Sequence, residues 1–174
     1  GWGATQAHLD KVCWLGCPAY VEQQLRAEPR APLTAAAQTQ IEALSIERRS
    51  VQELVTEIDG LRRQQDAMPT EDERKPARQA YQQGLNLLAR EACHRQLLRQ
   101  LYAEQQLLEQ MSWFWFNHFN VHQYKRELRA LLADYEESAL RPQALGSFRQ
   151  LLGAVARHPA MLRYLDNDQN SAGK

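Results

Sequence analysis

The chain has 174 residues, of which 44% are hydrophobic and 24% charged, which is ordinary for a globular protein with one core. It carries 21 basic and 21 acidic residues, so its net charge is zero and no overall field attracts nucleic acid or an anionic membrane. No apolar run approaches the roughly 18 to 20 residues that span a bilayer. We therefore expect no nucleic-acid partner and no membrane span.

Helix-forming residues dominate the sequence. Gln, Glu, Arg, Leu and Ala are abundant, and all have high helix propensity. Runs of β-branched residues that alternate with a period of two are absent. The sequence therefore predicts an all-α fold.

The first predicted elements are short helices with recognisable ends. Thr5 is placed to cap a helix over residues 6–14, and Gly16 is typical of the residue that follows a helix. A second helix is predicted over 18–27, where the leading proline suits the first turn. After a proline-rich break, a third helix with a threonine cap is predicted over 34–44.

The middle of the chain predicts two longer helices joined by a tight turn. Ser50 and Glu53 have the spacing of a capping box, which begins a helix over 50–67. Thr70 and the three acidic residues after it are typical of a second helix start. Apolar residues then recur every three or four positions over 76–119, which predicts one long helix or two nearly collinear ones.

This long helix would extend roughly 60 Å and needs support along its length. The helix over 50–67 is its natural antiparallel partner, because the connecting turn is short. We predict a long antiparallel helical hairpin with short helices packed at its ends.

Shorter helices are predicted over 123–140, 148–156 and 160–165, separated by Arg-Pro and His-Pro breaks. The polar residues 166–174 are expected to form a mobile tail. Residues 1–165 are then expected to form a single helical domain.

His118 and His122 are four residues apart, so on a continuing helix both imidazoles would lie on one face and could bind a divalent metal. Glu109, His158 and Asp166 are the candidates for further ligands. The alternative is that His118 packs against the neighbouring aromatic rings while His122 faces solvent.

Five aromatic residues cover every side of one predicted helix, namely Trp113, Phe114, Trp115, Phe116 and Phe119. A helix that is apolar all round is normally buried in a core. The alternative is a platform for a sugar or an aromatic ligand, with Trp113 and Trp115 as candidate binding residues.

Polar residues beside this aromatic segment must be paired if they are buried. Asn117, His118 and Asn120 are the candidates, and Arg141, Asp166 and Asn167 are their expected partners. Such a network would be either the floor of a site or a structural clasp. If His118 acts as an acid or base, we expect Asp166 to orient it.

The chain has three cysteines, an odd number that cannot close a disulfide framework. Burial as small apolar side chains is the default expectation. A bridge from Cys17 to Cys13 or to Cys93 is an alternative in an oxidising compartment. A zinc site formed by the three cysteines and His94 is another.

Three stretches carry a family resemblance: the aromatic segment 113–119, the segment 140–152, and the segment 158–167. Their order and spacing resemble those of the large bacterial "domain of unknown function 1800" family, and the first residues of the chain are similar to its N-terminal region. The resemblance covers nearly the whole chain. One departure is Phe116, where the family usually has His or a similar polar residue.

The resemblance implies properties that composition does not show. Members of the family are usually much longer and continue past the segment 158–167, so this chain is expected to be an N-terminal part. Members often carry export signals, which implies a periplasmic or secreted location. The family has no accepted reaction.

Two functions are left open. The first is an exported structural or interaction protein completed by a C-terminal half, so that its partner is the remainder of its own polypeptide or another protein. The second is an exported enzyme, metal-dependent or not, in which Asn117, His118, His158 and Asp166 form one wall of a site shared with that half. Convergence of these four side chains on a cavity would favour the enzyme.

Overall fold

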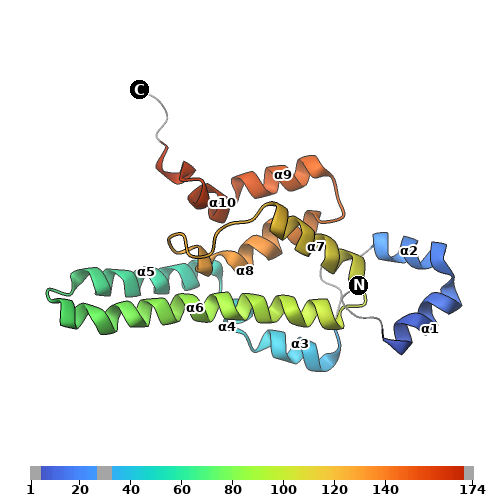
Figure 1. Cartoon of the computed structure of the whole chain (residues 1–174), viewed down its shortest axis with the longest axis horizontal. Helices are drawn as coiled ribbons and strands as arrows, with labels where there is room; N and C mark the ends of the chain where they lie inside the picture. The colour runs from blue at the N-terminus through green and yellow to red at the C-terminus, as the bar shows by residue number, and fades with distance from the viewer. Residues whose placement is uncertain (1–4, 27–32, 171–174) are drawn as a thin grey trace.

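The computed structural model describes residues 5–26 and 33–170. All regular elements in these two ranges are helical, which confirms the predicted all-α fold (Figure 1). The helices are α1 (Gln6–Leu15), α2 (Cys17–Leu25), α3 (Ala35–Glu42), α4 (Ser45–Arg48), α5 (Val51–Ala67), α6 (Glu71–Tyr102), α7 (Gln106–His118), α8 (Leu132–Asp134), α9 (Phe148–Arg157) and α10 (Pro159–Tyr164), with the 3-10 or π segments η1 (Leu128–Ala130), η2 (Tyr135–Leu140), η3 (Arg141–Gln143) and η4 (Asn167–Gln169).

The predicted capping residues begin the helices that follow them. The side chains of Thr5, Thr34, Ser50 and Thr70 each accept a hydrogen bond from the backbone N–H three residues later. After Ser50 and Thr70, a glutamate at that third position reaches back to the cap backbone, which completes both capping boxes. Gly16 has a φ of 75°, a conformation that favours glycine, and it separates α1 from α2.

Helices α5 and α6 lie side by side and run in opposite directions (Figure 1). Their contact is an apolar cluster in which Leu54 and Ile58 of α5 pack with Leu85 and Leu88 of α6. Helix α6 has 32 residues and α5 has 17, so the second half of α6 extends beyond its partner. Other helices pack against this second half of α6, and they include α3, α4 and α8.

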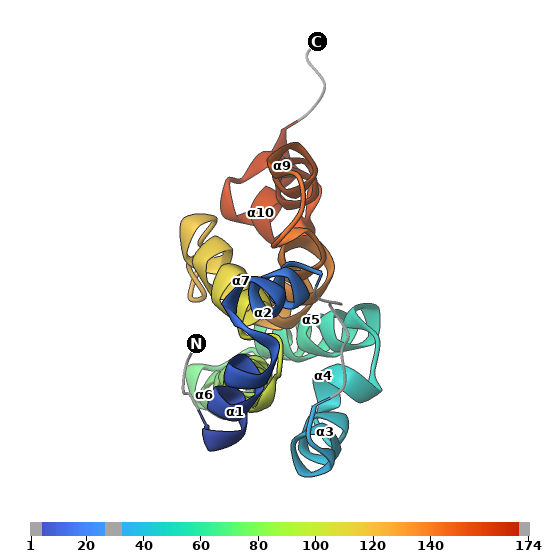
Figure 2. The same ribbon diagram turned by 90° about the vertical axis from the view of Figure 1, so that its right-hand side faces the viewer.

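The prediction of one long helix, or two nearly collinear helices, over 76–119 is wrong. Helix α6 ends at Tyr102, and α7 begins at Gln106 and turns back over α6 (Figures 1 and 2). Neither proline nor glycine stands at residues 103–105, so the break has another cause.

Glutamine side chains stabilise this break. The Nε2 group of Gln106 donates to the carbonyl oxygens of Gln100 (3.1 Å) and Ala103 (2.8 Å), which the end of α6 leaves free. Gln24, from α2, donates to the carbonyl of Glu104 at 3.0 Å. These partners come partly from distant sequence, so the local pattern gave no sign of the break.

The predicted helix over 123–140 begins later than expected. The chain is irregular or turned up to Glu127, and the helical path then runs from η1 through α8, η2 and η3. Its centre is Tyr135, which has no exposed surface and donates from its hydroxyl to the carbonyl of Phe119 at 2.8 Å. The main core forms around this ring and includes Leu128, Leu140 and Val155.

The helices form successive layers (Figure 2). Helices α3 and α4 lie on one side of α6, while α7 and the α8–η2 segment lie on the other, and α9 and α10 form the layer farthest from α6. Helices α1 and α2 pack at the end of this arrangement, where α2 contacts α7. No helix in the described part of the chain is long and apolar enough to cross a membrane.

Candidate functional site

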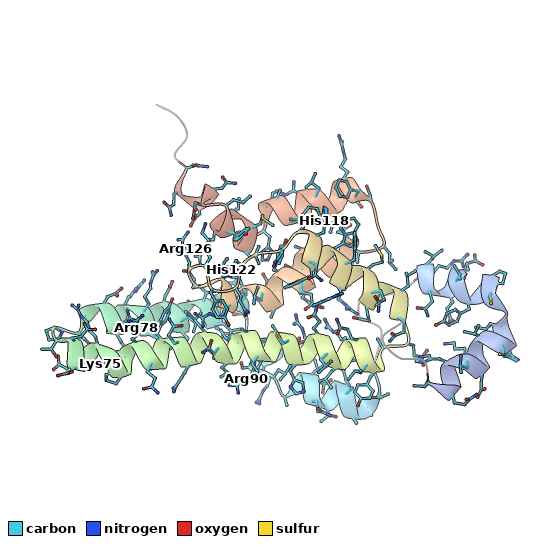
Figure 3. All side chains as sticks on the ribbon, viewed as in Figure 1. Lys75, Arg78, Arg90, His118, His122 and Arg126 are labelled. Carbon is cyan, nitrogen blue, oxygen red and sulfur yellow. The ribbon has the colours of Figure 1, made fainter. Side chains whose placement is uncertain are left out.

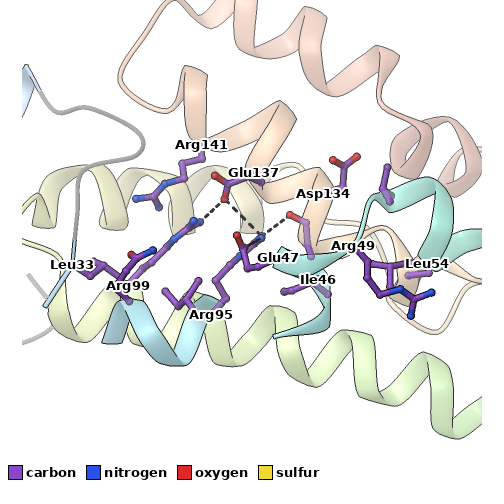
Figure 4. Close-up of a pocket in the computed structure, with 15 residues that line it drawn as sticks. Leu33, Ile46, Glu47, Arg49, Leu54, Arg95, Arg99, Asp134, Glu137 and Arg141 are labelled. Carbon is purple, nitrogen blue, oxygen red and sulfur yellow. Dashed lines mark hydrogen bonds and ion pairs between the residues drawn. The ribbon is translucent and has the colours of Figure 1, made fainter. Parts of the chain in front are cut away.

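Two arginines on the buried side of α6 face acidic residues from other helices (Figure 4). Arg95 is only 3% exposed, and its guanidinium donates to the carboxylate of Glu47 at 2.7 Å and to the carbonyl of Ala133 at 2.6 Å. One turn later, Arg99 donates to the carboxylate of Glu137 at 2.5 Å. These contacts join α4, α6, α8 and η2 through charged hydrogen bonds.

A second buried ion pair lies close by in the fold. Arg141 of η3 binds the carboxylate of Glu109 in α7 with two nitrogens, one of them at 2.8 Å, and both side chains are almost fully buried. A buried charge without a partner is very unfavourable, and here each charged group is the partner of the other. The pair fixes α7 against the segment that follows η2.

The adjacent carboxyls of Glu136 and Glu137 have opposite protonation tendencies. Burial raises the pKa of Glu136 above its ordinary value, against the lowering effect of the Arg95 charge. Burial also acts to raise the pKa of Glu137, but the charge of Arg99 and its hydrogen bond outweigh burial and hold that pKa below its ordinary value. The π-helical turn of η2 positions both groups.

A cavity of about 440 Å³ adjoins this network, and its wall includes Arg95, Arg99, Glu47 and Glu137 (Figure 4). The charges of these four side chains are already paired with one another. The Nε group of Arg95 is a buried donor without a hydrogen-bond partner among the described residues. The arrangement acts first as a clasp between helices that are distant in sequence.

A second cavity of about 310 Å³ lies between α6, α7, the loop after α7, and the α8–η2 segment. We call it the aromatic cavity, because the rings of Trp113, Phe116 and Tyr124 form part of its wall. Gln96 and Glu136 contribute polar groups to the same wall. A largely apolar hollow with a few convergent polar groups is the usual form of a small-molecule site.

The comparison with protein families covers the whole chain. A family described as "Protein of unknown function (DUF1800)" matches residues 1–174. The chain belongs to the DUF1800 family. This confirms the resemblance drawn from segments 113–119, 140–152 and 158–167. No curated protein and no solved structure matches the chain.

Membership of the DUF1800 family brings no reaction with it, so each predicted site residue is considered by its contacts. His118 is the last residue of α7 and is exposed. Its ring packs against Trp115 (centroids 5.7 Å apart) and Phe119 (4.8 Å). Asn117 is also exposed and donates to the carbonyl of Trp113 at 2.7 Å, within its own helix.

The other aromatic residues of this DUF1800 segment divide between core and cavity. Trp115 is partly buried, packs on the main core and donates from its indole to the carbonyl of Ala144 at 2.9 Å. Trp113 is 37% exposed and lines the aromatic cavity. Phe116, the departure from the family pattern, also lines that cavity and packs on Tyr135.

His158 caps a helix. Its Nδ1 accepts from the N–H of Ala160 at 3.1 Å at the start of α10, which leaves Nε2 to donate to the carboxylate of Asp134 at 2.9 Å. It is 7% exposed. These two contacts give His158 a structural role at the junction of α9 and α10.

The last predicted residues contact a different part of the chain. Asp166 has a φ of 58° and pairs with Lys125 at 2.6 Å. Asn167 accepts from Asn170 at 3.0 Å and is exposed. The expected partnership of Asn117 and His118 with Arg141, Asp166 and Asn167 is thus replaced, because Arg141 binds Glu109 and Asp166 binds Lys125. Residues 171–174 of the predicted tail lie outside the described residues.

The expected placement of His118 and His122 on one face of a continuing helix does not occur. Helix α7 ends at His118, so His122 lies in the following loop and the two do not share a helix face (Figure 3). The proposed further ligands Glu109, His158 and Asp166 are engaged by Arg141, Asp134 and Lys125, respectively. Within residues 5–26 and 33–170, no three His, Cys, Asp or Glu side chains form a group able to hold a metal.

The cysteines also differ from expectation. Cys13, Cys17 and Cys93 are all exposed and unbridged in this structure, so the expectation that they are buried is wrong. The zinc site proposed for them and His94 has the same outcome as the histidine pair, since no such group forms in the described part of the chain.

The charged network was not predicted from the sequence. Its available signal was Arg95, which falls between Ala92 and Leu98 on the apolar face of α6. A charged residue at such a position is rarely buried without a partner. The partners themselves, Glu47 and Glu136, come from distant segments and could not be identified from spacing.

Proposed function

We propose that this chain is a structural and interaction module of an exported bacterial protein, whose helices α1 and α2 dock onto a further part of the same polypeptide. The observation that carries the proposal is the exposure of apolar side chains on this helix pair. Trp14 is 84% exposed, and Leu9, Val21 and Leu25 are each more than half exposed. Large apolar side chains that gather on the surface of one helix pair favour an interaction site.

The attachment of α1 and α2 to the rest of the chain is mainly polar. The one buried residue that the two helices contain is Gln24. It bonds to the backbone of Glu104 and Leu107, and Lys11 pairs with Glu104 at 3.0 Å. The apolar side chains of the pair are therefore left available, and covering a tryptophan removes about 150–250 Å² from water.

The choice of occupant rests on the family resemblance. DUF1800 members resembling this chain are usually longer, and the polypeptide beyond the segment 158–167 is the partner with the highest local concentration. The exported setting rests on the same resemblance. Cell fractionation tests it, because a gene product found wholly in the cytosol would exclude a periplasmic or secreted location.

An enzyme with a site at Asn117, His118, His158 and Asp166 has less support. Asn117 and His118 contact residues of their own helix α7, whereas His158 bonds to Asp134 and Asp166 pairs with Lys125. No observation favours their convergence on one cavity. The interaction module is therefore the proposal that the geometry supports.

The three free cysteines provide a direct test of docking. In the full-length gene product, Cys13 and Cys17 should react with N-ethylmaleimide about ten-fold more slowly than Cys93, a protection equivalent to about 1.4 kcal/mol of docking free energy. Mass spectrometry of labelled peptides measures each rate separately. The Trp14→Ser variant should restore fast labelling, because it removes the largest exposed apolar side chain of the pair.

The matched control is Leu97→Ser, which changes an apolar residue that is 51% exposed on α6. It should leave the labelling rates of Cys13 and Cys17 as they are in the wild type. Equal and fast labelling of all three cysteines in the full-length protein would contradict the proposal, as would protection that Trp14→Ser leaves unchanged.

A further inference from the structure

The aromatic cavity has walls that are held in place before any ligand arrives. Phe116 packs against the buried ring of Tyr135, with centroids 6.2 Å apart. Tyr124 lies under the guanidinium of Arg129 at 5.3 Å, a cation–π contact. Fixed walls reduce the entropic cost of binding.

Arg129 is itself held by hydrogen bonds, and it holds the ring of Tyr124 in turn. Its guanidinium donates to Asn86 at 2.6 Å and to Gln82 at 2.8 Å, both on α6. It is 6% exposed. Two helices and the loop between α7 and η1 therefore share one connected set of contacts around the cavity.

The polar groups of the wall have hydrogen-bonding capacity to spare. The Nε2 group of Gln96 is a buried donor without a partner among the described residues, and such groups require an explanation. Glu136 is 3% exposed, and its ion pair with Arg95 spans 3.9 Å, which is too long for a hydrogen bond.

The polar part of the cavity wall consists of amide, carboxyl and imidazole groups. Burial raises the pKa of Glu136, and its carboxyl group can accept hydrogen bonds whether or not it is protonated. The remaining polar side chains include the amides of Gln96 and Asn120. Amides, which donate and accept, and a carboxyl group, which accepts, match hydroxyl groups, which also donate and accept.

We propose that the aromatic cavity binds a single ring of a neutral sugar, stacked on Trp113 and hydrogen-bonded to Gln96 and Glu136. A sugar ring has an apolar C–H face, which suits an aromatic surface, and a rim of hydroxyls. The volume of about 310 Å³ is at the lower end of ligand sites, which suits one ring rather than a long chain. A purely aromatic ligand would leave the buried amide of Gln96 without a partner.

Saturation-transfer NMR on the whole chain tests this inference with D-glucose, D-galactose and N-acetyl-D-glucosamine as probes. At least one sugar should give saturable transfer, with a dissociation constant on the order of 1 mM, as expected for a small ligand with few contacts. Phenol serves as the purely aromatic comparison. Transfer to phenol with none to any sugar would overturn the proposal, as would the absence of transfer to all four compounds.

Paired variants locate the binding. Gln96→Leu should weaken sugar binding by about ten-fold or more, because one hydroxyl loses its partner. Gln83→Leu, an exposed glutamine on the same helix outside the cavity wall, should not. Likewise, Trp113→Ala should weaken binding, while Phe114→Ala, the exposed neighbour outside that wall, should leave it unchanged.

Thermal unfolding separates binding from folding in these variants. Gln96→Leu removes a buried donor that has no partner, so it should not lower the melting temperature. Loss of binding with unchanged stability supports the cavity. Binding that survives both Gln96→Leu and Trp113→Ala, or that falls equally in the control variants, would place the sugar elsewhere and reject the proposal.

Discussion

At the scale of single residues, position relative to two arginines decides how neighbouring carboxyls behave. Glu136 and Glu137 follow each other in η2, but Glu136 faces the interior while Glu137 is 23% exposed and hydrogen-bonded to Arg99. Burial therefore dominates for the first, and ion pairing for the second. Their effects on stability should have opposite dependence on pH.

The pKa of Glu136 is raised in the folded state, so its contribution to stability is complete below its ordinary pKa of 4.5 and is lost as pH rises above that value. Replacing it with a permanently neutral group removes this loss. We expect Glu136→Gln to become progressively more stable than the wild type as pH increases from about 4.5. Urea unfolding at a series of pH values measures the difference.

Glu137→Gln provides the opposite case. The pKa of Glu137 is lowered, so its contribution is present above 4.5 and disappears as pH falls through the lower, folded-state pKa. This variant should be less stable than the wild type near neutral pH, and the difference should shrink in acid. If the two variants respond to pH in the same direction, the assigned surroundings of these carboxyls are wrong.

At the scale of helices, two glycines show how packing changes the effect of helix propensity. Gly60 of α5 has no atom within 4 Å of where a Cβ would lie, whereas a Cβ on Gly84 of α6 would meet Ile58 at 3.1 Å and Leu61 at 3.2 Å. Gly60→Ala should therefore stabilise the protein by the full propensity gain of about 1 kcal/mol. Gly84→Ala should gain less, because α5 and α6 approach closely there.

Thermal or urea unfolding of the two glycine variants makes the comparison direct, since both substitutions add one methyl group to a helix interior. Equal stabilisation by both would show that Ile58 and Leu61 move aside freely. A larger gain from Gly84→Ala than from Gly60→Ala would contradict the close packing of α5 on α6.

Helix starts were predictable from sequence because capping is local. Ser50 and Thr70 each have their glutamate three residues later, so all atoms of the capping box lie within one turn. The break after Tyr102 was not predictable. It is stabilised by Gln106 together with Gln24, and Gln24 lies some 80 residues away in the sequence from the carbonyl it binds.

The candidate sites show the same difference between local contacts, which the sequence predicts, and contacts between distant segments, which it does not. Trp113 and Phe116 of the aromatic segment line the aromatic cavity, as does His122 in the loop after α7. The polar partners assigned to it from motif order, Arg141 and Asp166, contact other residues instead. Order along the chain does not determine which side chains meet when the connecting helices turn back on themselves.

At the scale of the whole molecule, α1 and α2 are joined to the rest of the fold through one buried polar side chain. Gln24 is 5% exposed, donates to the carbonyl of Glu104 at 3.0 Å and accepts from the N–H of Leu107 at 3.1 Å. The same residue therefore fixes the helix pair and the turn between α6 and α7. The ion pair of Lys11 with the exposed Glu104 adds little to this, as surface pairs usually do.

Gln24→Ala should destabilise both the attachment of α1 and α2 and the turn between α6 and α7. It leaves the backbone groups of Glu104 and Leu107 without their partner, at a cost of about 1–3 kcal/mol. Hydrogen exchange followed by mass spectrometry should show faster exchange in α1, α2 and residues 103–107, with α5 unchanged, because α5 lies at the far end of α6. Gln23→Ala, an exposed neighbour on the same helix, is the matched control and should exchange like the wild type.

Uniform acceleration across all helices would mean that the pair is part of one cooperative unit, and unchanged exchange near residue 104 would mean that the glutamine does not hold the turn. Selective loosening would show that the helix pair opens separately from the core, as expected of an element that docks onto a further part of the polypeptide.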